Sequence, residues 1–112
     1  MKTFVYLNLD QVLAIHYDQI ESYGGSHGVR DLDLLLSAIS RCQTTFADED
    51  LYPDILSKTA SLIHSLILNH PFIDGNKRTG IVSGARMLFD NGFILKVSKK
   101  DMVNPALKIA SK

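Results

Sequence analysis

The sequence contains one cysteine, no tryptophan and three prolines in 112 residues, and its formal net charge at pH 7 is zero. The single Cys42 excludes an intramolecular disulfide and any zinc site that needs two thiolates, so we expect a buried cysteine in a reducing compartment. Twelve basic and twelve acidic residues cancel, which leaves no overall field that would draw the chain onto nucleic acid or an anionic membrane. Any phosphate group that the protein binds must be held by local contacts.

Long hydrophobic runs are missing as well. The N-terminal stretch MKTFVYLNLD has a five-residue apolar-rich run before Asn8, which is too short for the core of a signal peptide. No run approaches the roughly 20 residues of a membrane-spanning helix, so we expect a cytoplasmic protein. Hydrophobic residues make up 46% of the chain and charged residues 21%. With no linker or repeat to divide it, the chain predicts one globular domain over residues 1–112.

Apolar residues at helical spacing predict a mainly α-helical chain. A short strand at 3–7 is expected before a helix that begins at Asn8, forms a capping box with Gln11 and ends at Gly24–Gly25. A second helix, with one apolar stripe, is expected over 31–42.

Residues 43–53, QTTFADEDLYP, combine acidic and turn-favouring residues and predict a loop or an irregular hairpin. A central helix with a broad apolar face is predicted over 54–69. Asp74 is predicted to cap another helix, which runs to about Asn91 and stops at Gly92.

Beyond this helix the pattern predicts a short extended piece at 93–97. Ser98 and Asp101 then resemble a capping box that opens a last helix, in which Pro105 makes a kink.

The segment HPFIDGNKRTG, residues 70–80, connects two of the predicted helices. Taken singly, its residues fit a tight connection with solvated cations. Lys77 and Arg78, however, fall in the first turn of the following helix, where the N–H groups and the helix dipole are already positive. A bound anion would remove this conflict, and phosphate suits converging N–H donors, a lysine and an arginine fork.

His70 and Asp74 are expected at the edge of such an anion site. A carboxylate next to bound phosphates is a common way to hold Mg²⁺, and a histidine can take a proton from an attacking hydroxyl. The set therefore predicts group transfer from a nucleotide to a hydroxyl. Gly80 and Gly84 lie four residues apart on one helix face, and close packing of two helices explains them better than ligand contact.

Three other motifs fail on residue identity. The segment GNKRTGIV resembles the start of a P-loop, but Ile81 and Val82 replace its lysine and hydroxyl residue. The segment DGNKRTG has Ala85 in place of the closing glutamate of a calcium loop. His64 and His70 are six residues apart and do not share a helix face, so they predict no paired-histidine zinc site.

The segment HPFIDGNKR resembles the signature of the Fic/Doc family, His-Pro-Phe-x-Asp/Glu-Gly-Asn-Gly/Lys-Arg, and matches it at every defined position. A weaker similarity extends from about residue 8 to 110 and includes YGG at 23–25. The resemblance implies a mainly α, single-domain Fic fold, which is a helical bundle with a short hairpin or irregular flap at 43–53. In the family, this flap holds an extended segment of the target by backbone pairing.

The resemblance also implies roles for individual residues. His70 would deprotonate the target hydroxyl, Phe72 would pack beneath the loop, and Asp74 would help to coordinate Mg²⁺. The phosphates of ATP would be bound by the four residues that follow: Gly75, Asn76, Lys77 and Arg78.

Two positions distinguish branches of the family. Lys77 replaces the second glycine of the commoner Fic signature, and Ile81 replaces its final arginine. Both changes resemble the Doc, or death-on-curing, toxins. They imply transfer of the γ-phosphate of ATP to a Ser or Thr hydroxyl of a translation protein, with elongation factor Tu as the expected target. Two alternatives stay open: AMP transfer to a protein hydroxyl, and a catalytically inactive protein-binding module.

Restraint of such a toxin is expected to come from a partner. Self-restrained Fic proteins resemble one another in an inhibitory Ser/Thr-x-x-x-Glu-Gly/Asn helix, which is not found here because Thr45 to Glu49 is followed by Asp50. We therefore expect an antitoxin with a disordered tail. The end at Lys112 is expected to leave apolar surface that this tail, or a missing final helix, would cover.

The remaining histidines and two arginines carry less information. His16 and His64 are expected to be structural residues on helix faces, and His27 is expected to be exposed. Arg41 and Arg86 would need to lie near the loop to reach the phosphates, and the sequence does not place them.

Overall fold

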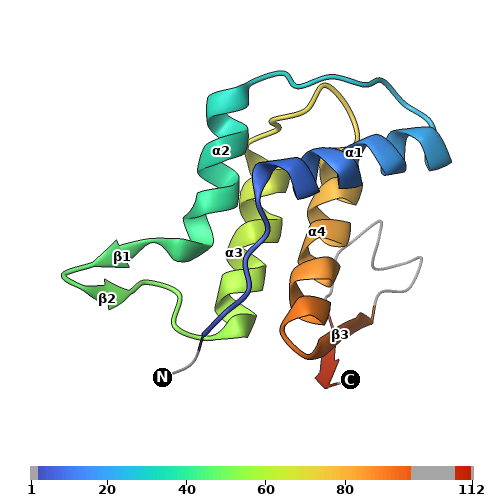
Figure 1. The fold of residues 1–112 in the computed structure, drawn as a ribbon. Helices are drawn as coiled ribbons and strands as arrows, with labels where there is room; N and C mark the ends of the chain where they lie inside the picture. The colour runs from blue at the N-terminus through green and yellow to red at the C-terminus, as the bar shows by residue number, and fades with distance from the viewer. Residues whose placement is uncertain (1–2, 97–107, 112) are drawn as a thin grey trace.

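The computed structural model describes residues 3–96 and 108–111, and its described part is mainly α-helical (Figure 1). Helices α2, α3 and α4 stand next to one another, and α1 crosses α4 near the connection between α3 and α4. This arrangement confirms the predicted mainly α bundle with a small hairpin. None of the described helices is long and apolar enough to cross a membrane.

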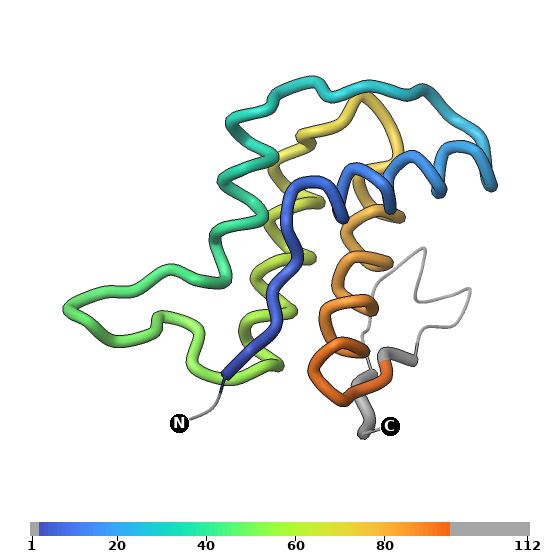
Figure 2. The backbone as a smooth tube through the Cα atoms, in the orientation of Figure 1, coloured from blue at the N-terminus to red at the C-terminus, as the bar shows by residue number. Residues whose placement is uncertain are grey.

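Helix α1 (Leu9–Tyr23) begins with the predicted capping box between Asn8 and Gln11 and ends at Gly24, which has a φ of +88°. The strand predicted at 3–7 is not formed, because none of the described strands lies beside this segment to complete a ladder. The side-chain amide of Asn91 instead accepts from the Val5 N–H and donates to its carbonyl, both at 2.9 Å. Figure 2 shows the resulting path of the N-terminal segment up to α1.

Helix α2 (Leu32–Ser40) is capped by Asp31 and continues as a 3₁₀ turn (Arg41–Gln43), close to the predicted bounds. Cys42 in this turn is buried, as predicted. Strands β1 (Thr45–Phe46) and β2 (Glu49–Asp50) then form an antiparallel hairpin, which confirms the hairpin alternative predicted for this region.

Helix α3 (Ile55–Leu68) carries a capping box at Asp54 and packs along α4. The packing explains both helical glycines, as predicted. A Cβ at Gly80 would lie 3.1 Å from Ile67 Cγ1, and one at Gly84 would overlap the side chain of Ile63. The two helices therefore approach closely along this stripe.

Helix α4 (Asn76–Asp90) starts differently from the prediction. Its N-cap is Gly75, with a φ of +75°, and not Asp74. The Asp74 carboxylate accepts instead from the N–H groups of Gly75 at 2.8 Å and Ser26 at 3.1 Å, so it is held outside the helix. Glycine enters the left-handed region at little cost, which makes this sharp entry into the helix possible. The predicted stop at Gly92, with a φ of +94°, is confirmed.

Strand β3 (Phe93–Lys96) confirms the predicted extended piece and pairs antiparallel with β4 (Lys108–Ser111). The predicted start of a last helix at Ser98 and its kink at Pro105 lie outside the described residues. Residues 108–111 form a strand, so the predicted last helix does not extend into them. Pairing with β3 satisfies backbone groups that an unpaired edge would leave to water.

The apolar core lies between the four helices. Its buried members are Leu7, Val12, Leu35, Ala38, Ile39, Cys42, Leu62, Leu66, Phe72 and Met87. Phe72, which comes from the α3–α4 connection, therefore anchors this connection in the core, as predicted.

Candidate functional site

The α3–α4 connection forms one wall of a pocket of about 450 Å³ at the N-terminus of α4. Its lining consists of His70, Ile73, Asp74, Gly75, Asn76, Lys77 and Arg78. The structure thus brings together all six residues that the sequence nominated for the site. They are close because α3 ends just before the first of them and α4 begins at Asn76, among the last.

His70 follows the end of α3 in an unusual conformation. Its φ is +46°, in the left-handed region, where non-glycine residues are uncommon. Pro71 disfavours α-helical geometry at the preceding residue, which accounts for the end of α3 at this point. The side chain of His70 is exposed and faces the pocket.

His16 of α1 packs against the α3–α4 connection. The residue is 4% exposed, and its ring stacks on the Phe72 ring, with centroids 3.8 Å apart and an interplanar angle of 4°. Its Nε2 donates to the Asp74 carbonyl at 2.8 Å. Burial lowers the pKa of His16 below its ordinary value, so the ring is neutral near pH 7. The prediction of a structural histidine is confirmed, and its contact with the pocket loop was not foreseen.

Asp74 is charged in this setting. Its pKa is lowered, first by the hydrogen bond from the Ser26 N–H and then by the one from Gly75, while Arg78 and His16 contribute less. The described residues contain no group of three or more His, Cys, Asp or Glu that could hold a metal ion. A single charged carboxylate still suits Mg²⁺, which keeps most of its ligands as water and phosphate oxygens. The donor set therefore fits a metal that arrives with a nucleotide.

Asn76 is buried, and both ends of its side-chain amide are occupied. Oδ1 accepts from the Phe72 N–H and Nδ2 donates to the Phe72 carbonyl, each at 2.9 Å. The amide thus pairs with the loop as a neighbouring strand would. Its contribution to anion binding is therefore limited to the backbone N–H, which has no intrahelical acceptor in the first turn.

The guanidinium of Arg78 already donates to backbone carbonyls of the protein. Its Nη2 donates to the Gly24 carbonyl at 3.0 Å and its Nη1 approaches the Gln19 carbonyl at 3.5 Å. These carbonyls lie at the C-terminal end of α1, where the helix dipole is negative and favours a cation. The conflict of two cations in the first turn of α4 is therefore partly resolved within the protein. Lys77 lines the pocket next to Arg78.

A family model described as the Fic/DOC family matches residues 6–88. The chain belongs to the Fic/DOC family. The family assignment made from the sequence is confirmed.

Two curated proteins are similar to this Fic/DOC chain. "Toxin Doc" of Mycolicibacterium smegmatis is 42% identical over 71 residues, which cover 63% of this chain and 55% of that protein. "Protein kinase doc" of Escherichia phage P1 is 30% identical over 87 residues, which cover 78% of this chain and 68% of that protein. The first match thus spans little more than half of its relative. The similarity places the chain among the Doc-like members of the family.

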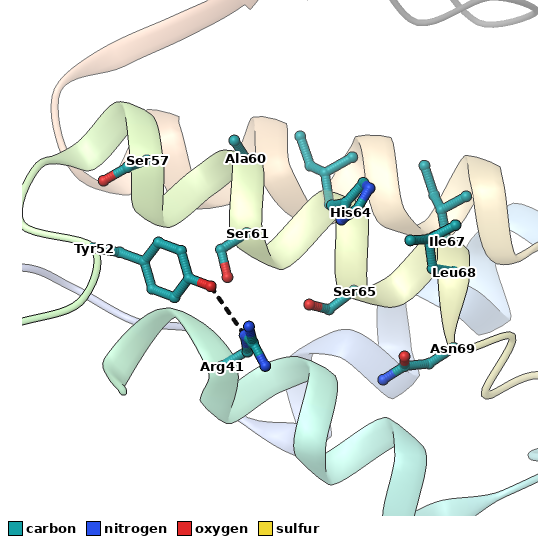
Figure 3. Close-up of a pocket in the computed structure, with 11 residues that line it drawn as sticks. Arg41, Tyr52, Ser57, Ala60, Ser61, His64, Ser65, Ile67, Leu68 and Asn69 are labelled. Carbon is teal, nitrogen blue, oxygen red and sulfur yellow. Dashed lines mark hydrogen bonds between the residues drawn. The ribbon is translucent and has the colours of Figure 1, made fainter. Parts of the chain in front are cut away.

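A larger groove of about 750 Å³ lies between the end of α2 and one face of α3 (Figure 3). Arg41 donates from Nε to the Tyr52 hydroxyl at 2.9 Å, and this bond lowers the pKa of Tyr52. The enclosed Ser61 hydroxyl makes no hydrogen bond of ordinary length within the described part of the chain. The groove contains neither His70 nor the residues that follow it, so the chemistry predicted from the sequence belongs to the smaller pocket.

The two arginines that the sequence left unplaced both lie away from that pocket. Arg41 lines the larger groove. Arg86 pairs with Asp90 at 3.0 Å near the other end of α4. His64 is exposed in the larger groove, so its predicted structural role is not supported, whereas His27 is exposed as predicted and pairs with Glu21 at 2.8 Å.

Proposed function

We propose that this Fic/DOC protein transfers the γ-phosphate of ATP to a Ser or Thr hydroxyl of another protein. The observation that carries the proposal is the convergence of His70, Asp74, Lys77 and Arg78 on one pocket at a helix N-terminus. A base, a charged carboxylate and two cations are what a phosphoryl transfer requires, because its catalysis depends mainly on position and charge. The relative named a protein kinase supports the same reaction type.

In this mechanism His70 takes the proton of the target hydroxyl as its oxygen attacks the γ-phosphorus. The bond between the γ-phosphorus and the β–γ bridging oxygen breaks, and ADP leaves with that oxygen. Lys77, Arg78 and the N–H groups of the first turn of α4 hold the phosphates. Asp74 would help to hold Mg²⁺, which would neutralise phosphate charge when bound.

The choice between γ-phosphate and AMP transfer depends on how the nucleotide lies. Lys77 occupies the position where the commoner Fic signature has a glycine, and its side chain takes space next to the anion site. Ile81 is buried, so the position of the final Fic arginine provides no second phosphate contact. Both residues favour the orientation that presents the γ-phosphate to the hydroxyl.

Labelled ATP distinguishes the alternatives. The protein is incubated with Mg²⁺, a bacterial lysate and ATP that carries the label on either the γ- or the α-phosphate. We expect label on a protein from γ-labelled ATP alone, and none with the His70→Ala variant. His64→Ala is the matched control, because this exposed histidine of α3 does not line the pocket. Label from α-labelled ATP would instead assign AMP transfer, and no label with either would leave a binding module.

We further propose elongation factor Tu as the target and a toxin role that an antitoxin restrains. The hairpin β1–β2 supports a protein target, because its residues are all exposed and its edges carry no further strand in the described structure. Mass spectrometry of elongation factor Tu after the reaction should show the mass of one phosphate. The modification on another protein would keep the reaction and change the target. Co-purification of a small partner that stops the labelling would support the antitoxin.

A further inference from the structure

The position of His70 depends on its backbone. In the part of the chain that the structure describes, its imidazole makes no hydrogen bond to another residue. The residue sits between the end of α3 and Pro71, with the uncommon φ of +46°. Because no such hydrogen bond holds the imidazole, its direction depends strongly on the main chain of His70, so whatever fixes this main chain also helps to aim the imidazole.

Arg30 fixes this main chain with a two-pronged contact. Its Nε donates to the His70 carbonyl at 2.6 Å, and its Nη2 donates to the Asn69 carbonyl at 2.8 Å. The last carbonyls of a helix have no intrahelical donor, and a cation there is favoured by the dipole. Donors on a charged guanidinium make stronger and shorter hydrogen bonds than neutral donors. One side chain therefore satisfies two consecutive carbonyls at the end of α3.

The backbone around Arg30 is itself tied to the same loop. The N–H of Arg30 donates to the Pro71 carbonyl at 2.7 Å, and the Ile73 N–H donates to the Gly28 carbonyl at 3.0 Å. Val29 and Phe72 form an isolated antiparallel bridge between these segments. The guanidinium is thus presented from a segment that is already in register with the residues after His70. Little freedom remains for the two segments to move apart.

We infer that Arg30 is a positioning residue for the reaction, which holds the main chain of His70 so that its imidazole faces the pocket. This inference rests on the proposed function, in which His70 is the base. Arg30 does not line the pocket, so it is placed to act through His70. A lysine would carry the charge, but as a point charge it cannot reproduce the planar fork on both carbonyls.

The first test does not depend on activity. The backbone order parameter of His70, measured by NMR relaxation in the full chain, is compared in the wild type, Arg30→Met and Arg30→Lys. We expect a rigid value of about 0.85 in the wild type, a value below about 0.6 in Arg30→Met, and an intermediate one in Arg30→Lys. Arg86→Met is the matched control, since Arg86 is an exposed arginine that pairs with Asp90 on α4. An unchanged His70 in Arg30→Met overturns the inference.

The second test uses γ-labelled ATP and bacterial lysate. Displacement of a catalytic group by about 1 Å can cost about a hundredfold in rate, so we expect the apparent kcat of Arg30→Met to fall ten- to a hundredfold. The KM for ATP should change less than twofold, because the phosphate contacts are intact, and Arg30→Lys should recover part of the rate. A loss of order at His70 with an unchanged kcat overturns the positioning role. If the wild type transfers no label, the proposed function fails, and the NMR comparison alone decides what Arg30 holds.

Discussion

Lys58 of α3 is buried with its charge, and replacing it by methionine tests what holds the hairpin to the helices. Its side chain is 0% exposed, and its Nζ donates to the Cys42 carbonyl at 3.2 Å and pairs with Asp50 of β2 at 3.0 Å. The ammonium also lies 5.0 Å from the ring centroid of Phe4 and 5.5 Å from that of Tyr6. Burial opposes the charge, yet contacts with Asp50 and Tyr6 raise the pKa of Lys58 above its ordinary value.

Methionine keeps the apolar stem and removes only the charge and the donors. The lost hydrogen bond from a charged donor contributes about 1.5–3 kcal/mol, and each ring contact contributes from about 0.5 kcal/mol, as at exposed sites, up to about 2 kcal/mol where the cation is dehydrated. The ion pair adds little, because the Asp50 side chain is 39% exposed and remains solvated after the substitution. Relief of the dehydration of a buried ammonium offsets part of this loss. We expect Lys58→Met to lower the free energy of unfolding by roughly 1–3 kcal/mol, given these opposing contributions.

Urea unfolding followed by circular dichroism gives this free energy, and the thermal midpoint should fall by about 5–15 °C. Asp50→Asn, which removes only the ion pair, should cost less than about 1 kcal/mol. A double-mutant cycle with both substitutions separates the pair from the other contacts. If Lys58→Met is as stable as the wild type or more stable, the dehydration cost exceeds the contacts and the reasoning is refuted.

Three further substitutions test the packing of the site and of the helices α3 and α4. Because burial lowers the pKa of His16, its neutral form stabilises the fold above about pH 6.5, and this contribution is lost as the pH falls. The urea midpoint should therefore drop between pH 8 and pH 5.5 in the wild type and drop less in His16→Gln. Equal drops in the two proteins would contradict this. Gly84→Ala should lower the thermal midpoint, because the overlap of the new Cβ with Ile63 costs about 1–3 kcal/mol. This cost exceeds the gain of about 1 kcal/mol in helix propensity. A higher midpoint would mean that Ile63 moves aside. Asn76→Ala should lower the free energy of unfolding in urea by about 2–4 kcal/mol, because two buried backbone groups of Phe72 lose their partners. A loss below about 1 kcal/mol would show that water replaces the amide.

Local sequence patterns predicted most of the helices with nearly the observed bounds. The predicted capping box of Asn8 with Gln11 acts over three residues, so its effect depends little on the rest of the fold. The same reasoning placed Asp74 one position too early in the role of N-cap. A carboxylate at the start of a helix is a sound N-cap signal. Here, however, the Asp74 carboxylate accepts a hydrogen bond from the N–H of Ser26, which is 48 residues away in the sequence.

The members of the pocket were predictable because they are nearly contiguous. A loop that joins two packed helices must bring its own residues together, whatever else surrounds them. The supporting residues were not predictable in the same way. Arg30 lies in an exposed segment with an arginine–aspartate pair, which alone does not indicate a contact with a loop about forty residues further along. Nor does a lone His16 on a helix face show which carbonyl it reaches.

The sequence by itself determined the family, the order of the helices and the set of chemical groups in the pocket, since these depend on a nine-residue signature and on local capping and periodicity. Only the tertiary structure decided how those groups are held. The Arg30 fork on His70, the contact of His16 with the Asp74 carbonyl and the burial of Lys58 all depend on which surfaces meet when the helices pack. Most of these contacts join residues far apart in the chain, and packing brings such residues together in a way that no local pattern records.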